Sequence, residues 1–155
     1  MFKHSHIVFN EKYIIDDKVT RDMAIKYIEK ASIIWILGGD TLKQISYIKD
    51  YDLIPALQRR EGLTIGMSAG SINMAKKVVL AKDESDNIPE LSLYTGIGLV
   101  DVNVEPHFNE ATEEHIEEIK KAAQIAPIYA LHDGSFIKVD FNGMRIFGPY
   151  HLFAK

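Results

Sequence analysis

A serine stands between two glycines in residues 66–70, where the sequence reads Gly-Met-Ser-Ala-Gly. An apolar stretch, residues 63–67, leads into this segment and an amphipathic stretch follows it, so Ser68 falls at a predicted turn from strand to helix. Only small neighbours fit around such a turn, and the helix start directs free backbone N–H groups towards the hydroxyl. The pattern is typical of a nucleophile elbow, which presents a serine for attack on a carbonyl carbon. The alternative is an ordinary turn rich in glycine and serine.

A serine nucleophile needs a base, and a histidine usually supplies it. His107 follows Pro106 at the end of a predicted strand, and we expect it to be the base. His132 follows another predicted strand and would line the same site. The remaining histidines are less suitably placed, near the chain ends or within a charged helix: His4, His6, His115 and His151. The alternative for His107 is a structural histidine at a strand end.

The histidine in turn needs an acceptor on its other ring nitrogen, normally a carboxylate. Residues 82–87, between Ser68 and His107, form a predicted loop with three acidic side chains. These are Asp83, Glu84 and Asp86. A solvated acidic loop accounts for most of them, and the residue types alone leave the choice of the triad acid open.

An acyl-transfer site also needs two N–H donors for the oxyanion. The N–H of Ala69 directly follows the serine and is the natural first donor. Gly39, in the Gly-Gly turn after the apolar run 32–37, is the natural second donor because glycine lets the backbone approach a substrate closely. The same turn also has a structural reading, with Asp40 or Thr41 capping the next helix.

Helices and strands alternate along the sequence. Helices are predicted over residues 20–31, 41–49, 53–60, 69–77 and 112–124, and strands over 32–37, 63–67, 99–104, 128–131, 135–141 and 144–147. Residues 7–9 and 13–15 read as short extended segments, and residues 83–93 as a loop. This order predicts an α/β fold with helices on both faces of a mostly parallel sheet. Active sites of such sheets lie at the carboxyl ends of the strands, where the candidate residues fall.

Composition narrows the function classes. The 155 residues predict a single domain spanning residues 1–155. A net charge of −4 gives no reason to expect nucleic acid or an anionic membrane as partner. The absence of cysteine excludes a thiolate nucleophile, a disulfide and a cysteine-ligated metal. Without a long apolar span or a signal-peptide core, the sequence predicts a cytoplasmic protein. We also expect no metal or cofactor.

Three segments in this order resemble the peptidase E and cyanophycinase family of serine peptidases, in the class I glutamine amidotransferase-like superfamily. They are Ile-Leu-Gly-Gly-Asp-Thr at 36–41, Gly-Met-Ser-Ala-Gly-Ser at 66–71 and Pro-His-Phe at 106–108. The resemblance covers about residues 30–140. It implies a three-layer α/β/α sandwich and a metal-independent serine peptidase, with Ser68 as nucleophile and His107 as base.

The resemblance also orders the three acidic candidates. Cyanophycinases carry their glutamate in an Asp-Glu-Ser stretch, which is similar to residues 83–85 and favours Glu84. An ungapped count from the elbow of the aspartyl dipeptidases reaches Asp83, the second choice, and Asp86 is third. The implied reaction is hydrolysis of a small peptide, as by a dipeptidase, or of an isopeptide-like amide, through an acyl-enzyme.

The resemblance further implies that the family's first strand-helix unit is missing here. Such a gap would leave backbone groups and apolar surface for a partner chain to cover, as in a homodimer. The competing hypothesis is therefore a shortened, catalytically impaired member that acts as a binding or scaffold protein. An α/β-hydrolase esterase is a third alternative, which the short chain disfavours. Amidotransferase activity is disfavoured because those relatives use cysteine at the elbow.

Overall fold

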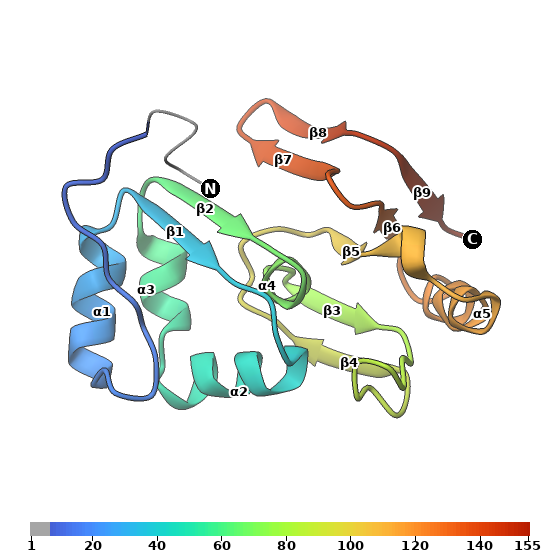
Figure 1. The fold of residues 1–155 in the computed structure, drawn as a ribbon, viewed down its shortest axis with the longest axis horizontal. Helices are drawn as coiled ribbons and strands as arrows, with labels where there is room; N and C mark the ends of the chain where they lie inside the picture. Colours follow the sequence, from blue (N-terminus) through green and yellow to red (C-terminus); the bar gives the residue numbers. More distant parts are fainter. Residues whose placement is uncertain (1–6) are drawn as a thin grey trace.

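The computed structural model describes residues 7–155 and has the expected α/β character (Figure 1). His4, His6 and the N-terminal stretch without a signal-peptide core lie outside the described residues. Residues 7–9 and 13–15 form no strand. Within residues 7–155, no helix is long and apolar enough to cross a bilayer.

The helices are close to their predicted bounds, with one exception. They are α1 (Arg21–Lys30), α2 (Thr41–Asp50), α3 (Ile54–Arg59), α4 (Ala69–Asn73) and α5 (Glu113–Ala122), together with the short 3-10 helix η2 (Phe108–Glu110). Side-chain caps explain where the three longest helices, α1, α2 and α5, begin. Thr20, Asp40 and Thr112 each accept a hydrogen bond from a backbone N–H in the first turn of α1, α2 and α5. The exception is α4, which ends well before the predicted residue 77.

The strands form short sheets in which both kinds of pairing occur. They are β1 (Ile33–Ile36), β2 (Leu63–Gly66), β3 (Lys77–Leu80), β4 (Ser92–Thr95), β5 (Asn103–Glu105), β6 (Ile128–Leu131), β7 (Phe136–Asp140), β8 (Gly143–Phe147) and β9 (Tyr150–Phe153). The pairs β1–β2 and β5–β6 are parallel, whereas β3–β4, β6–β9 and β7–β8 are antiparallel. The α/β class is confirmed, but the expected predominance of parallel strands does not emerge from the described pairs.

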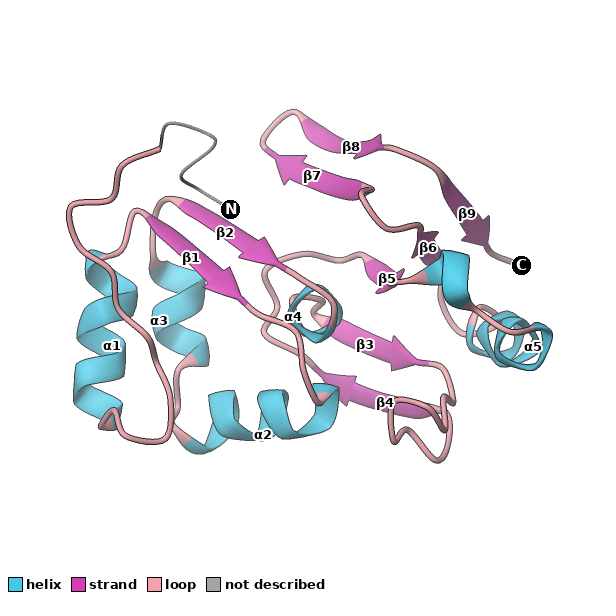
Figure 2. Ribbon diagram, viewed as in Figure 1, coloured by secondary structure: helices cyan, strands magenta, loops and turns pink. Residues whose placement is uncertain are grey.

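Packing of the helices places the two parallel pairs near the centre of the molecule. Helices α1 and α3 lie beside β1 and β2, and α2 runs close below them, while α5 lies at the far end (Figure 2). A buried cluster joins these first three helices to Ile36, and a second cluster joins β3, α5 and β6. Helix α4 sits between the two regions and contacts β2, α2 and β5. The carboxyl ends of β1, β2, β5 and β6 carry most of the residues discussed below.

Candidate active site

Ser68 occupies a strained turn between β2 and α4. Its φ of 51° and ψ of −122° lie in a region that residues other than glycine rarely adopt. Such strain persists only where the surrounding structure imposes it, and here β2 and α4 fix both sides of the turn. The side chain is half-buried, and its hydroxyl has no hydrogen-bond partner among the described residues. A sharp, strained turn from strand to helix is also where a nucleophile elbow places its serine.

The glycines around Ser68 allow β1, β2 and α4 to approach each other closely. A Cβ at Gly70 would lie 2.1 Å from the carbonyl oxygen of Ile36, at the end of β1. A Cβ at Gly66 would lie 2.7 Å from the Cα of Ser71. Real Cβ atoms do not come this near to backbone atoms, so each glycine is required by packing.

The Gly-Gly turn that ends β1 lies against the elbow. A Cβ at Gly38 would lie 3.1 Å from the Cβ of Ser68 and 3.6 Å from its hydroxyl oxygen. Gly39 has a φ of 135° and faces open space. In the part of the chain that the structure describes, neither the Gly39 N–H nor the Ala69 N–H donates to another protein group. The turn that carries Gly39 thus lies beside Ser68 through Gly38, and Ala69 follows the serine in the chain.

Asp40 closes the Gly-Gly turn as the cap of α2. Its carboxylate accepts a hydrogen bond of 3.0 Å from the N–H of Lys43, whose ammonium group lies 3.2 Å away. These contacts, the backbone N–H first, lower the pKa of Asp40. The capping interpretation of this residue is thereby confirmed, and it anchors the turn to α2.

His107 lies two residues beyond β5 and is bound to Asp133. Its Nδ1 is 2.7 Å from a carboxylate oxygen of Asp133, and both side chains are about half exposed, at 49% and 54%. His107 has a φ of 58°, which turns the chain sharply after Pro106. The N–H of Asp133 donates to the side chain of Asn109 at 2.9 Å, so the carboxylate is itself held. An ionised carboxylate only accepts, so Nδ1 carries the proton and Nε2 is free to act as a base.

Strand pairing explains this contact. β5 and β6 are parallel, with Glu105 opposite Ala130, so the segments that follow them leave the same edge of the sheet. His107 and Asp133 both lie in those following segments. The sequence pattern placed His132 at this edge but missed Asp133, its neighbour. Asp133 meets the same criterion that selected His107, because it is a polar residue just beyond a predicted strand.

The three acidic residues of the 82–87 loop lie elsewhere. Glu84 is 78% exposed and pairs with Lys82 at 2.7 Å, a contact that lowers the pKa of Glu84. Asp83 accepts hydrogen bonds from the backbone and hydroxyl of Ser85, and Asp86 is exposed. No hydrogen bond or ion pair joins any of these described carboxylates to His107. Strand pairing instead brings Asp133, from beyond β6, to the histidine, and the choice of Glu84 as triad acid stays a prediction.

A second histidine is placed more deeply, in a cluster beside the candidate site. The Nδ1 of His115 lies 3.0 Å from the carbonyl oxygen of Lys82, and its Nε2 lies 3.3 Å from the carboxylate of Glu105. Asp83 is 3.8 Å away from the same nitrogen. The Glu105 carboxylate, assisted by Asp83, raises the pKa of His115 to about 9, while burial raises the pKa of Glu105. His115 therefore joins α5, the end of β5 and the 82–87 loop.

This cluster predicts a pH-dependent stability. A histidine whose pKa is raised by folding stabilises the protein fully below about pH 6.5, and the contribution disappears as pH rises through about 9. We expect the free energy of unfolding to fall by roughly 2–3 kcal/mol from pH 6.5 to pH 10 in wild type, and this loss to vanish in His115→Gln. Guanidinium unfolding at both pH values measures it. His151→Gln, which changes an exposed histidine, should keep the wild-type slope, and equal slopes in wild type and His115→Gln would contradict the assignment.

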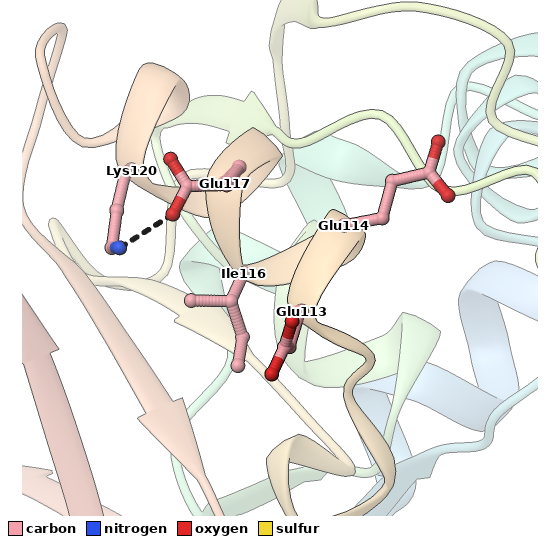
Figure 3. Close-up of a pocket in the computed structure, with 5 residues that line it drawn as sticks. All are labelled: Glu113, Glu114, Ile116, Glu117 and Lys120. Carbon is pink, nitrogen blue, oxygen red and sulfur yellow. Dashed lines mark hydrogen bonds and ion pairs between the residues drawn. The ribbon is translucent and has the colours of Figure 1, made fainter.

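Two surface hollows lie away from Ser68. One is lined by side chains of α5 alone, as Figure 3 shows: Glu113, Glu114, Ile116, Glu117 and Lys120. Glu117 and Lys120 pair across one turn at 2.6 Å, as solvated helix surfaces commonly do. Another, of about 210 Å³, lies between the 82–87 loop and the start of α5. Among residues 7–155, no three His, Asp or Glu side chains are grouped to hold a metal ion.

The elbow and the His107–Asp133 pair come from adjoining elements. α4, which begins after Ser68, contacts β5, which leads to His107. No hydrogen bond joins the hydroxyl of Ser68 to the ring of His107 within the described residues. Catalytic hydrogen bonds are often long before a substrate binds, so this spacing is compatible with a role for both. The arrangement brings together a serine on a strained turn, a histidine bound to a carboxylate, and two backbone N–H groups without a protein acceptor among the described residues.

Comparison with known sequences identifies the family of this chain. The sequence profile of Peptidase family S51 matches residues 10–147. Peptidase E of Salmonella typhi is 29% identical over 133 residues, which are 78% of this chain and 57% of that protein. Peptidase E of Salmonella arizonae is 26% identical over 136 residues, 80% of this chain and 58% of that protein. The chain thus spans little more than half the length of these curated relatives.

Solved structures agree on the fold. A Listeria monocytogenes protein described as a candidate peptidase E superposes with a TM-score of 0.66 at 18% identity, over 83% of this chain and 65% of its own. A peptidase from an acI-B1 actinobacterium gives 0.64 at 15% identity, over 88% and 61%. Identities this low speak for the fold alone. Together with the sequence profile, which spans most of the residues, they show that this chain belongs to peptidase family S51.

Proposed function

We propose that this chain is a serine peptidase in which Ser68 is the nucleophile. The observation that carries the proposal is the backbone of Ser68, which is held at a φ of 51° between β2 and α4. A non-glycine residue in this conformation signals that the structure maintains strain at that point. The relatives named peptidase E support the same reaction class.

The base and its orienting acid are proposed to be His107 and Asp133. The 2.7 Å contact fixes the proton on Nδ1 and leaves Nε2 to accept the proton of the Ser68 hydroxyl. Asp133 takes the role for which the sequence favoured Glu84. Glu84 points to Lys82 and is largely exposed, so it offers no comparable restraint on the ring.

The oxyanion donors are proposed to be the N–H groups of Gly39 and Ala69. The Ser68 oxygen attacks the carbonyl carbon while its proton passes to His107, and the carbonyl oxygen becomes an oxyanion between the two donors. The C–N bond then breaks, and the same proton goes from His107 to the leaving amine. Water then gives a proton to His107 and attacks the acyl carbon, and as the ester C–O bond breaks that proton passes to the oxygen of Ser68, which releases the carboxylic acid and the free hydroxyl.

The substrate class is proposed to be a small peptide or an isopeptide-like amide. The open space beside Gly39 and the half-exposed His107–Asp133 pair suit a small, accessible substrate. The proposal includes no metal or cofactor, because the five groups named above supply nucleophile, base, orientation and charge stabilisation.

A fluorophosphonate probe tests the nucleophile. We expect wild type to be labelled once, on the tryptic peptide that contains Ser68, and Ser68→Ala to lose the label completely because the attacking oxygen is gone. Ser46→Ala is the matched control, since its hydroxyl bonds to Asp50 on the exposed side of α2. A folded wild-type sample that remains unlabelled under conditions that label a known serine hydrolase would refute the proposal.

The competing function is a binding or scaffold protein with an impaired site. Its specific support is the missing hydrogen bond between Ser68 and His107 and the apolar exposure of β1 and β2, where Ile33 is 36% and Leu63 54% exposed. A second copy of the chain, as a homodimer, would cover such surface. This alternative expects a cooperatively folded protein that is neither labelled by the probe nor able to hydrolyse a dipeptide library.

A further inference from the structure

A buried amide on the elbow helix is connected to the Gly-Gly turn. Asn73, at the end of α4, is fully buried and its side-chain nitrogen donates to the carbonyl of Thr41 at 2.9 Å and to the side chain of Gln44 at 3.1 Å. Its side-chain oxygen accepts from the hydroxyl of Tyr94 on β4 at 2.9 Å. Gln44 passes the connection on, because its own nitrogen donates to the carbonyl of Leu37 at 2.6 Å. We call Asn73, Gln44 and Tyr94 the amide network.

The amide network holds the Gly-Gly turn from both sides. Leu37 is the residue just before Gly38, and Thr41 follows Asp40, so the two accepting carbonyls bracket the turn that carries Gly39. The donor to one of them, Asn73, belongs to the same helix that begins with Ala69. The network therefore connects the elements that carry the two proposed oxyanion donors. Backbone contacts alone would join only the strand ends, through the Met67 N–H and the Ile36 carbonyl.

Each group in the network can adopt only one orientation. The carbonyl of Thr41 can only accept, so the Asn73 nitrogen faces Thr41 and Gln44, and the Asn73 oxygen accepts from the Tyr94 hydroxyl. Gln44 must then accept with its oxygen, so its nitrogen points to Leu37. Hydrogen bonds with one allowed arrangement restrict the side chains that form them. A buried polar group that loses its partner there lowers the free energy of unfolding.

We propose that Asn73 and Gln44 are positioning residues that set the distance between the Gly39 and Ala69 N–H groups, and with it the alignment of the oxyanion site. The inference rests on the proposed function of Ser68. Neither side chain contacts a substrate, since Asn73 is fully buried and Gln44 reaches the turn through the carbonyl of Leu37. Losing one oxyanion donor outright slows acyl transfer about 10²–10³-fold, and displacing one by a fraction of an ångström is a smaller change.

Gln44→Met is the direct test, because it removes the bond to Leu37 from a half-buried position and keeps the side-chain volume. We expect the second-order rate constant for fluorophosphonate labelling to fall about 10- to 100-fold. Gln58→Met is the matched control. Gln58 also donates to a backbone carbonyl, that of Ile97 at 2.7 Å, and not to either of the two carbonyls that bracket the turn. The control should label at the wild-type rate even where both variants lose similar thermal stability.

A second measurement does not depend on reactivity. In ¹H–¹⁵N spectra, the amide signals of Gly38 and Gly39 should shift or broaden in Gln44→Met and in Tyr94→Phe, and remain at their wild-type positions in Gln58→Met. If wild type is not labelled, the proposed function fails, whereas the glycine signals still decide the positioning role. Unchanged glycine signals in Gln44→Met, or a wild-type labelling rate in that variant while wild type is reactive, would overturn the inference.

Discussion

Asp133→Asn is expected to lower the rate of Ser68 labelling by a fluorophosphonate about 10³-fold. An asparagine amide would donate to Nδ1 of His107, which moves the ring proton to Nε2 and leaves no lone pair facing the serine. Removing the corresponding carboxylate from a buried triad costs about 10⁴ in rate. The effect here should be smaller because His107 and Asp133 are about half exposed, at 49% and 54%, and water can hold part of the imidazole population in the productive tautomer.

Glu84→Gln is the control that makes this test decisive. Glu84 pairs with Lys82 and is 78% exposed, so the substitution removes a surface ion pair of little energetic value and should change the labelling rate less than about twofold. Rate constants for both variants at neutral pH, together with unfolding midpoints, separate loss of the acid from loss of the fold. If Glu84→Gln lowers the labelling rate and Asp133→Asn leaves it unchanged, the triad acid is in the 82–87 loop and not Asp133.

Local signals made much of the fold predictable. α1, α2 and α5 begin at Thr20, Asp40 and Thr112, whose side chains accept from the first turn of the helix. These caps act within three residues, so the sequence alone carries them. The same holds for the elbow, since the spacing of Gly66, Ser68 and Gly70 is itself the local geometry. Ser68 has a φ of 51° and lies against Gly38, while its role as nucleophile stays a prediction.

Long-range pairing explains what was missed. Residues 74–77 were expected to continue a helix, but β3 begins at Lys77, where it pairs with β4. This partner lies well along the chain, so the local sequence does not reveal the strand. β9 was missed for the same reason, as it pairs with β6. The neighbour of His107 is likewise set by the β5–β6 register. The expected chain order of serine, acid and histidine directed attention to the 82–87 loop and away from Asp133.

Gly70→Ala is expected to destabilise the protein by about 3 kcal/mol, at the upper end for overpacking by a single methyl group. The added Cβ would lie 2.1 Å from the carbonyl oxygen of Ile36 and 2.9 Å from that of Leu37. Both are backbone atoms of the β1 segment, so neither can rotate away, and α4 would have to move off the strand. For a chain of this size, the midpoint of thermal unfolding should fall by roughly 6–12 °C.

Gly38→Ala provides the comparison, because it adds the same methyl group at a glycine whose φ is also outside the left-handed region. Its Cβ would meet the Cβ of Ser68 at 3.1 Å, a contact that a few tenths of an ångström relieve, so stability should change by about 1 kcal/mol or less. Equal midpoints for the two variants would show that α4 does not pack on β1 as closely as the structure places it. A large difference would show that the second glycine of the elbow is needed for helix-to-strand packing and not for a left-handed turn. The packing of α4 on β1 would then maintain the strained backbone of Ser68, because α4 cannot move away from β1 without changing the φ and ψ of that residue.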